Sequence, residues 1–197
     1  MTGSGKSTFL RRIAYELCRP DGRPGLQVAA GFPILIRIAA LEEHIRSCRE
    51  RHEGGAPTTQ ESHSWLVHFL EYHGQKLHWE LDADFFERRL GEESTYVLLD
   101  GLDEAVNRVD REAMARLLEA ATGQYRCRFV VTTRPGSYQG RATLAGFAQA
   151  QIDDLEDQAI DRFLKQWSQN LYPADPEGAR EHYRQLLGAL RGRADIN

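Results

Sequence analysis

Three short apolar segments recur along the chain, and each is typical of a buried β-strand. They are residues 32–38, 95–100 and 128–133, in which β-branched and aliphatic side chains follow one another without polar alternation. Strands of a parallel sheet covered on both faces have this pattern. The segment Thr95–Asp100 is the strongest, and it ends in an acid. A fourth segment, residues 147–152, alternates and predicts a last strand.

Between and after these segments, apolar residues recur at helical spacing. The intervals that this spacing predicts to be helical are residues 9–17, 41–49, 65–70, 85–90, 106–121, 156–171 and 183–190. Ser64 and either Asp82 or Asp84 are candidate N-caps. Alternating strands and helices predict an α/β fold with a mostly parallel sheet, and the last helices predict the start of a small helical subdomain.

Composition is that of a globular domain: 197 residues, 41% hydrophobic and 27% charged. The net charge of -4 gives no reason to expect nucleic acid or an anionic membrane as the main partner. No apolar run approaches the roughly 20 residues of a membrane span. Three cysteines are widely separated and lack metal-ligand spacing, which predicts reduced cytosolic thiols and not a disulfide framework or a zinc site: Cys18, Cys48 and Cys127.

Four histidines repeat every five residues: His63, His68, His73 and His78. On a helix this spacing rotates successive side chains too far to share one face. We therefore interpret the repeat as chance and do not expect a metal site there.

A glycine-rich turn stands directly before the first predicted helix and consists of Gly3, Ser4, Gly5, Lys6, Ser7 and Thr8. Such a turn points free N–H groups and the positive end of the helix dipole at one spot, which favours polyphosphate binding. Lys6 can reach the terminal phosphates, and the Ser7 hydroxyl can ligate the accompanying Mg²⁺. The alternative is a chance loop, because the full motif needs a glycine five positions before Gly5 and the chain begins one position too late.

Three carboxylates follow one another within five residues at the end of the strongest strand: Asp100, Asp103 and Glu104. Ligands of open parallel sheets bind beyond the carboxyl ends of the strands. Neighbouring carboxylates repel one another unless a cation lies between them. At Asp100 we expect this cation to be Mg²⁺, bound also by the phosphates of a substrate. For Asp103 and Glu104, acids that merely favour a helix N-terminus are an equally good interpretation.

Arg134 follows the third strand and is expected at the same edge of the sheet, within reach of a terminal phosphate. Its alternative role is a salt bridge to one of the nearby acids. Both roles could hold at different stages of one cycle.

Together these motifs resemble the NACHT family, which belongs to the STAND class of P-loop NTPases. The resemblance rests on the order and spacing of Gly3–Thr8, Phe32–Ile34, Leu98–Glu104 and Val131–Pro135, and it extends to about Leu171. Its most specific mark is the glycine directly after the strand-end aspartate, with acids two residues further on. The resemblance implies a three-layer P-loop NTPase sandwich over residues 1–154 and the start of a helical lid over residues 155–197.

The resemblance also implies roles for individual residues. Gly3–Thr8 match the Walker A loop that binds ATP or ADP, with Lys6 at the phosphates and Ser7 on Mg²⁺. Asp100 matches the Walker B aspartate that binds Mg²⁺. Asp103 and Glu104 match the acidic pair of hydrolysis, one of which orients or activates water. Arg134 matches the residue that reads the γ-phosphate.

Two features depart from the family pattern. The strand and the glycine that precede Gly3 are absent, and in the family that strand lies between the sensor strand and the last strand. We therefore expect a gap in the sheet that leaves the last strand unpaired. The family's winged-helix region is also absent, so we expect a fragment of a longer protein that carries sensor and effector domains.

The function implied is a cytoplasmic signalling switch: bound ADP holds a resting state, and ATP opens the lid and permits homo-oligomerisation, with slow Mg²⁺-dependent hydrolysis. Two alternatives stay open. A small-molecule kinase shares the phosphate loop and the strand-end aspartate, although Asp103 and Glu104 favour water as the acceptor. A degraded fragment could act only as an interaction surface.

Overall fold

The protein is described by a computed structural model, which covers residues 5–19, 30–105, 107–140, 143–153 and 155–194. This part of the chain forms three strands: β1 (Phe32–Arg37), β2 (Thr95–Asp100) and β3 (Arg128–Val131). Its seven α-helices are α1 (Lys6–Leu17), α2 (Ile38–Glu50), α3 (Trp65–Lys76), α4 (Ala83–Leu90), α5 (Arg108–Gln124), α6 (Asp157–Leu171) and α7 (Pro176–Ala194). Two compact units result, Met1–Ala150 and Gln151–Asn197.

The sheet of the first unit is parallel and has the order β1-β2-β3. β2 is the central strand, and its first five residues are buried, because both of its edges are paired and both of its faces are covered. The register places Arg37 of β1 opposite Asp100 of β2. The expected α/β class with a parallel sheet is confirmed. The three predicted strands are present: β2 has the predicted ends, and β1 and β3 finish one and two residues earlier than predicted.

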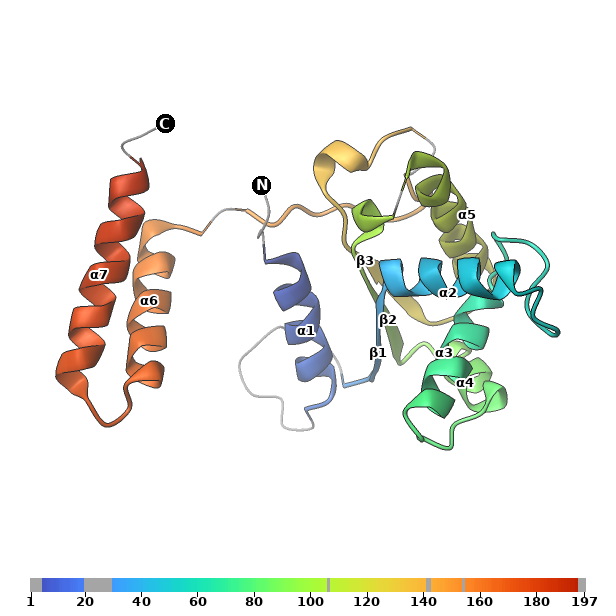
Figure 1. The fold of residues 1–197 in the computed structure, drawn as a ribbon, viewed down its shortest axis with the longest axis horizontal. Coiled ribbons are helices and arrows are strands. Elements are labelled where there is room, and N and C mark those ends of the chain that lie inside the picture. The colour runs from blue at the N-terminus through green and yellow to red at the C-terminus, as the bar shows by residue number, and fades with distance from the viewer. Residues whose placement is uncertain (1–4, 20–29, 106, 141–142, 154, 195–197) are drawn as a thin grey trace. The chain divides into compact units, whose positions relative to one another are not determined.

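Alternate residues of β2 face two different clusters of buried side chains. Val97 and Leu99 lie in the larger cluster, together with residues of α2, α3, α4 and α5. Tyr96 and Leu98 face α1 on the other side of the sheet, and Figure 1 shows α1 alone on that side within the first unit. The helix contributes three buried residues to this contact: Leu10, Ile13 and Leu17. The first unit therefore has the three layers of helix, sheet and helix.

Helix α1 runs antiparallel to the strands. Its last residue lies next to the start of β1, because the backbone N–H of Gly31 donates to the carbonyl oxygen of Leu17 at 3.1 Å. The first turn of α1 therefore lies at the end of the sheet at which β1 and β2 finish, as Figure 1 shows.

The expected last strand is not a strand. Residues 147–152 have no sheet partner in the structure, and most of their side chains are exposed. Alternation alone cannot form a strand, because backbone N–H and C=O groups also need a neighbouring edge. β3 is paired to β2 on one side, and no described strand lies on its other side.

The second unit consists of α6 and α7, which pack side by side. Leu164 and Ala179 are buried, and Ser168 Oγ lies 3.0 Å from His182 Nδ1. Tyr183 donates a hydrogen bond to Asp161. Both helices were predicted, and α7 begins seven residues earlier than its apolar spacing indicated. Proline at its first position is compatible with a helix start, because the missing N–H would have no partner there.

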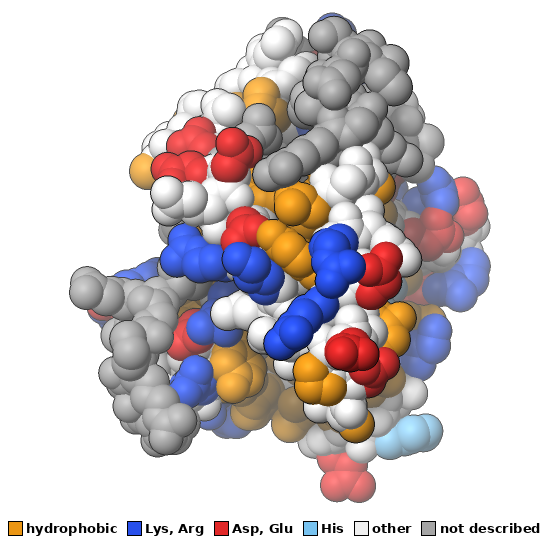
Figure 2. Space-filling model, turned by 90° about the vertical axis from the view of Figure 1, so that its left-hand side faces the viewer, with side chains coloured by type: hydrophobic (Ala, Val, Ile, Leu, Met, Phe, Trp, Pro, Cys, Tyr) orange, Lys and Arg blue, Asp and Glu red, His pale blue; other side chains and the backbone are white. Residues whose placement is uncertain are grey.

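The surface is mixed in charge. On the face drawn in Figure 2, acidic and basic side chains are interspersed around small hydrophobic patches. Of the described helices, none combines the length and the hydropathy that crossing a membrane requires. The three cysteines are free, with Cys18 exposed and the other two buried.

Replacing Asp82 by alanine should destabilise the first unit by about 1 kcal/mol, because the Asp82 carboxylate caps α4. Its oxygen accepts from the Phe85 N–H at 2.8 Å. Ser64 is a matched control, since it occupies the same position before α3 but its side chain makes no cap hydrogen bond. Urea unfolding followed by circular dichroism should show a loss for Asp82→Ala and almost none for Ser64→Ala. Equal effects would contradict the capping role.

Candidate functional site

Asp100 stands at the carboxyl end of β2, where a side chain that follows β3 holds it in place. The Thr132 hydroxyl donates to Asp100 Oδ1 at 2.8 Å and accepts from the Gly101 N–H at 3.0 Å. Thr132 is itself bound by backbone hydrogen bonds, because its N–H donates to Leu99 O and its carbonyl accepts from Leu102 N–H, both at 2.9 Å. The Asp100 carboxylate is therefore oriented by the neighbouring strand before any ligand binds.

Gly101 makes the turn that follows. Its φ of 84° and ψ of 57° are left-handed, a conformation that glycine adopts without steric cost. A Cβ at this position would lie 2.8 Å from the side chain of Glu104. The fully buried Leu102 then anchors a short 3₁₀ turn, Leu102–Glu104, from which the two further acids project. A residue without a Cβ is therefore needed between Asp100 and the two acids that follow it.

Asp103 and Arg134 form an ion pair at this edge of the sheet. Arg134 Nε lies 2.8 Å from Asp103 Oδ2; the Asp103 side chain is 5% exposed, whereas that of Arg134 is 48% exposed. Arg111 of α5 also donates to the Asp103 backbone carbonyl at 3.4 Å. Of the two roles considered for Arg134, the structure contains the salt bridge. The Asp103 carboxylate is shielded from water, and the Arg134 guanidinium is open to solvent.

Glu104 has a looser environment. Arg37 Nη2 lies 3.9 Å from Glu104 Oε2, and both side chains are well exposed, at 71% and 46%. Exposed pairs at this separation contribute little to stability, because water and salt screen them. The two acids of the pair therefore differ: Asp103 is committed to Arg134, and Glu104 is more accessible.

The described part of the glycine-rich turn begins at Gly5, since Gly3 and Ser4 lie outside the described residues. Gly5 is the N-cap of α1 with φ 76°, and its carbonyl accepts from Phe9 N–H at 2.8 Å. Among the described residues, no side chain caps this helix, and no acid lies in its first turn, which includes Lys6, Ser7 and Thr8. The N–H groups of an uncapped helix start are donors for an anion.

These features bring the predicted residues to one end of the first unit. α1 begins at the end of the sheet where β2 finishes with Asp100. Asp103, Glu104 and Arg134 lie at the same end. Sequence reasoning did not identify Thr132 as the group that orients Asp100. Its signal was present, however, because a polar residue follows the apolar run of β3.

The residues fit a magnesium-bound nucleotide. Carboxylate and hydroxyl oxygens are the ligands that Mg²⁺ prefers, and Asp100 and Ser7 are of these types. The Thr133 hydroxyl is buried beside Thr132 without a hydrogen-bond partner in the described structure. A buried hydroxyl of this kind is available to a ligand at this end of the sheet.

Comparison with known proteins gives one match. A family model, the NACHT domain, matches residues 1–170. Searches of curated proteins and of solved structures each returned no significant match. The matched range contains the glycine-rich turn, the strand-end aspartate with its following acids, and Arg134. The chain therefore belongs to the NACHT family, whose members are nucleotide-binding P-loop NTPases of the STAND class.

Proposed function

We propose that this chain is the nucleotide-binding module of a signalling switch, which binds ATP with Mg²⁺, hydrolyses it slowly and controls oligomerisation. Residues 1–154 are the nucleotide-binding domain, and residues 155–197 begin the lid. The observation that carries the proposal is the Arg134–Asp103 ion pair at the end of the sheet, which joins the proposed phosphate sensor to an acid that closely follows Asp100.

The binding step is assigned to the start of α1 and to Lys6. The uncapped N–H groups of the first turn donate to phosphate oxygens, and the Lys6 ammonium adds a positive charge. Ser7 and Asp100 hold the metal ion, which neutralises phosphate charge when bound. Asp100 needs no reorientation for this, because Thr132 already fixes its carboxylate.

The hydrolytic step is assigned to Glu104. Its carboxylate is exposed and has one distant ionic partner, so it can accept a proton from water or orient water. Asp103 is assigned a different role, because its carboxylate holds Arg134. The difference in exposure between the two carboxylates supports this division of roles.

The switch is assigned to Arg134. Its guanidinium is half exposed and pairs with Asp103, and a γ-phosphate offers a competing anion at the same edge. When Arg134 exchanges the Asp103 carboxylate for the γ-phosphate, the packing at this edge comes to depend on which nucleotide is bound. A ligand shifts such an equilibrium only by its difference in affinity for the two states. We place the protein in the cytoplasm, where its three free thiols would stay reduced.

The experiment that tests this function measures phosphate release from ATP by the full gene product, without any acceptor, together with its mass by light scattering. We expect slow Mg²⁺-dependent release, and a larger assembly with a non-hydrolysable ATP analogue than with ADP. Release only when a small-molecule acceptor is added would instead identify a kinase. No nucleotide binding at all would leave an interaction surface as the function.

Lys6→Ala should weaken ATP and ADP binding about 10- to 100-fold, because it removes a charge-assisted contact with the phosphates. Arg11→Ala is the control, since Arg11 is an exposed cation on the same helix, five residues further on. Calorimetric titration of the full gene product measures both variants. The phosphate-binding assignment is wrong if Lys6→Ala binds nucleotide as tightly as the parent.

Glu104→Gln should slow ATP hydrolysis about 10²- to 10⁴-fold and leave ATP affinity nearly unchanged, because the amide cannot accept the proton from water. Glu50→Gln, at the exposed end of α2, should have no effect on either quantity. Asp103→Asn should change the ratio of ATP to ADP affinity, because it releases Arg134. Single-turnover phosphate release gives the rates, and a parent rate in Glu104→Gln would refute the role of Glu104. Calorimetric titration gives the affinities, and an unchanged ratio of ATP to ADP affinity in Asp103→Asn would refute the role of Asp103.

A further inference from the structure

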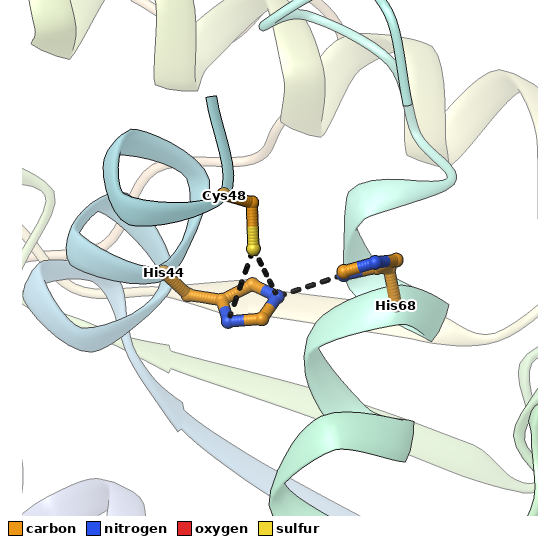
Figure 3. A group of neighbouring side chains, drawn as sticks. All are labelled: His44, Cys48 and His68. Atoms are coloured by element: carbon orange, nitrogen blue, oxygen red, sulfur yellow. Dashed lines mark hydrogen bonds between the residues drawn. The ribbon is translucent and has the colours of Figure 1, made fainter. Parts of the chain in front are cut away.

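Three metal-ligating side chains meet in the first unit, away from the acids at the sheet edge. His44 and Cys48 come from α2, and His68 comes from α3. One potential ligand atom from each lies within 4.8 Å of the others. Figure 3 shows the Cys48 sulfur over the His44 ring and the His68 ring beside it. We refer to these three residues as the His-Cys-His cluster.

Local sequence and packing build this cluster. His44 and Cys48 are four residues apart, so they lie on the same face of α2. That face packs toward α3, in a core that contains Ile45, Trp65 and Phe69. His68 is on the facing side of α3, 24 residues from His44 along the chain. The cluster therefore joins two helices across the loop of residues 51–64.

The surroundings of His44 keep its imidazole neutral. His44 is 6% exposed, and the rings of Trp65, Phe69 and Tyr72 lie with centroids 6.0, 5.6 and 4.7 Å from its own. Burial, with the nearby His68, lowers the pKa of His44 to about 4. The ring is therefore neutral near pH 7, which is the form that binds a metal ion.

The Cys48 thiol is set between opposite charges. Burial raises its pKa, and so does a hydrogen bond with Glu53. Arg51 Nη2 lies 4.0 Å from the sulfur and 3.2 Å from Glu53 Oε2. A divalent cation would replace the thiol proton, which leaves to solvent, and would form a sulfur–metal bond in its place.

The distances suit zinc with a small adjustment. Zinc bonds of about 2.05 Å to nitrogen and 2.3 Å to sulfur place tetrahedral ligands about 3.3 Å apart for two nitrogens and about 3.6 Å apart for nitrogen and sulfur. The Cys48 sulfur lies 3.7 Å from His44 Nε2. His44 Nε2 and His68 Nδ1 are 2.8 Å apart and share a hydrogen bond. The Cys48 sulfur and the His68 ligand atom lie within 4.8 Å of each other. To admit the ion, the two rings would have to separate by about half an ångström, and the proton that they share would move to the other nitrogen of its own ring.

We propose that His44, Cys48 and His68 bind a Zn²⁺ ion, with a water molecule as the fourth ligand. Two imidazoles and a thiolate form a ligand set that binds Zn²⁺ in preference to Mg²⁺ or Ca²⁺. The ion would clamp α2 to α3. Because α2 follows directly from β1 and packs with Leu102, the clamp would stiffen the helix behind the acidic turn. This inference does not depend on the proposed nucleotide function.

The test uses Co²⁺ as a spectroscopic substitute for Zn²⁺ on the reduced, chelator-treated chain of 197 residues. We expect one equivalent to give a thiolate-to-cobalt charge-transfer band and intense tetrahedral d–d bands, and Zn²⁺ to abolish both. Zn²⁺ should also raise the unfolding temperature, because it binds the folded chain. A chain that is folded by circular dichroism but gives no such bands would refute the site.

Variants with matched controls separate this cluster from other thiols and histidines. Cys48→Ser should abolish the charge-transfer band, whereas Cys18→Ser, at the exposed end of α1, should keep it. His68→Gln should weaken Zn²⁺ binding more than 100-fold. Loss of a residue that only hydrogen-bonds a metal ligand weakens binding roughly 10- to 100-fold. His73→Gln, one and a half turns further along α3, should bind as the parent does.

His68 is only partly buried, so His68→Gln keeps the test decisive if Cys48→Ser does not fold. Parent-like Zn²⁺ affinity in His68→Gln would show that His68 is not a ligand and would overturn the proposed site. Loss of the charge-transfer band in Cys18→Ser, with the band retained in Cys48→Ser, would assign the metal to a different thiol and would equally overturn it.

Discussion

The hydroxyl of Thr132 holds the candidate nucleotide site together. It connects the side chain of Asp100 to the backbone of Gly101, and the backbone of Thr132 connects to both neighbours of that pair in the chain. One residue after β3 thus fixes the end of β2 and the turn that follows. The acids can gather there because the backbone is already satisfied, so their arrangement does not have to compete with unpaired N–H groups.

Two kinds of electrostatic environment coexist at this edge of the sheet. The Asp103–Arg134 pair has a shielded carboxylate, whereas the Arg37–Glu104 pair is exposed at both ends. Screening by water makes the second pair weak and easily exchanged, and the first pair more persistent. This asymmetry supports a division of labour between a carboxylate that holds a sensor and one that meets water.

Much of this fold could be predicted from the sequence, because β2 is buried on both faces and its run is therefore uninterrupted by polar residues. The segment 147–152 could not be judged in the same way, because alternation does not show whether a segment pairs with an edge of the sheet, and this one does not. Asp82 and Ser64 look alike as caps in the sequence, but only the Asp82 backbone is extended, with ψ 175°, so that its carboxylate can reach back to an N–H.

The site residues could be predicted as a group, because the carboxyl ends of parallel strands meet at one edge of the sheet. Which of these residues contact one another could not be predicted. The Arg134–Asp103 contact and the Thr132 bridge depend on the register between β2 and β3. In the His-Cys-His cluster, the spacing of His44 and Cys48 on one predicted helix was a usable signal. The contribution of His68 depends on how α3 packs against α2, and the regular histidine repeat obscured it.

The order of the strands in the sheet has a consequence for synthesis of the chain. β1, β2 and β3 lie side by side in the same order in which the ribosome produces them. Among the described strands, none has to be inserted between two that have already paired. Each new strand can add to an exposed edge as it emerges, so the sheet can grow during translation without opening a closed ladder.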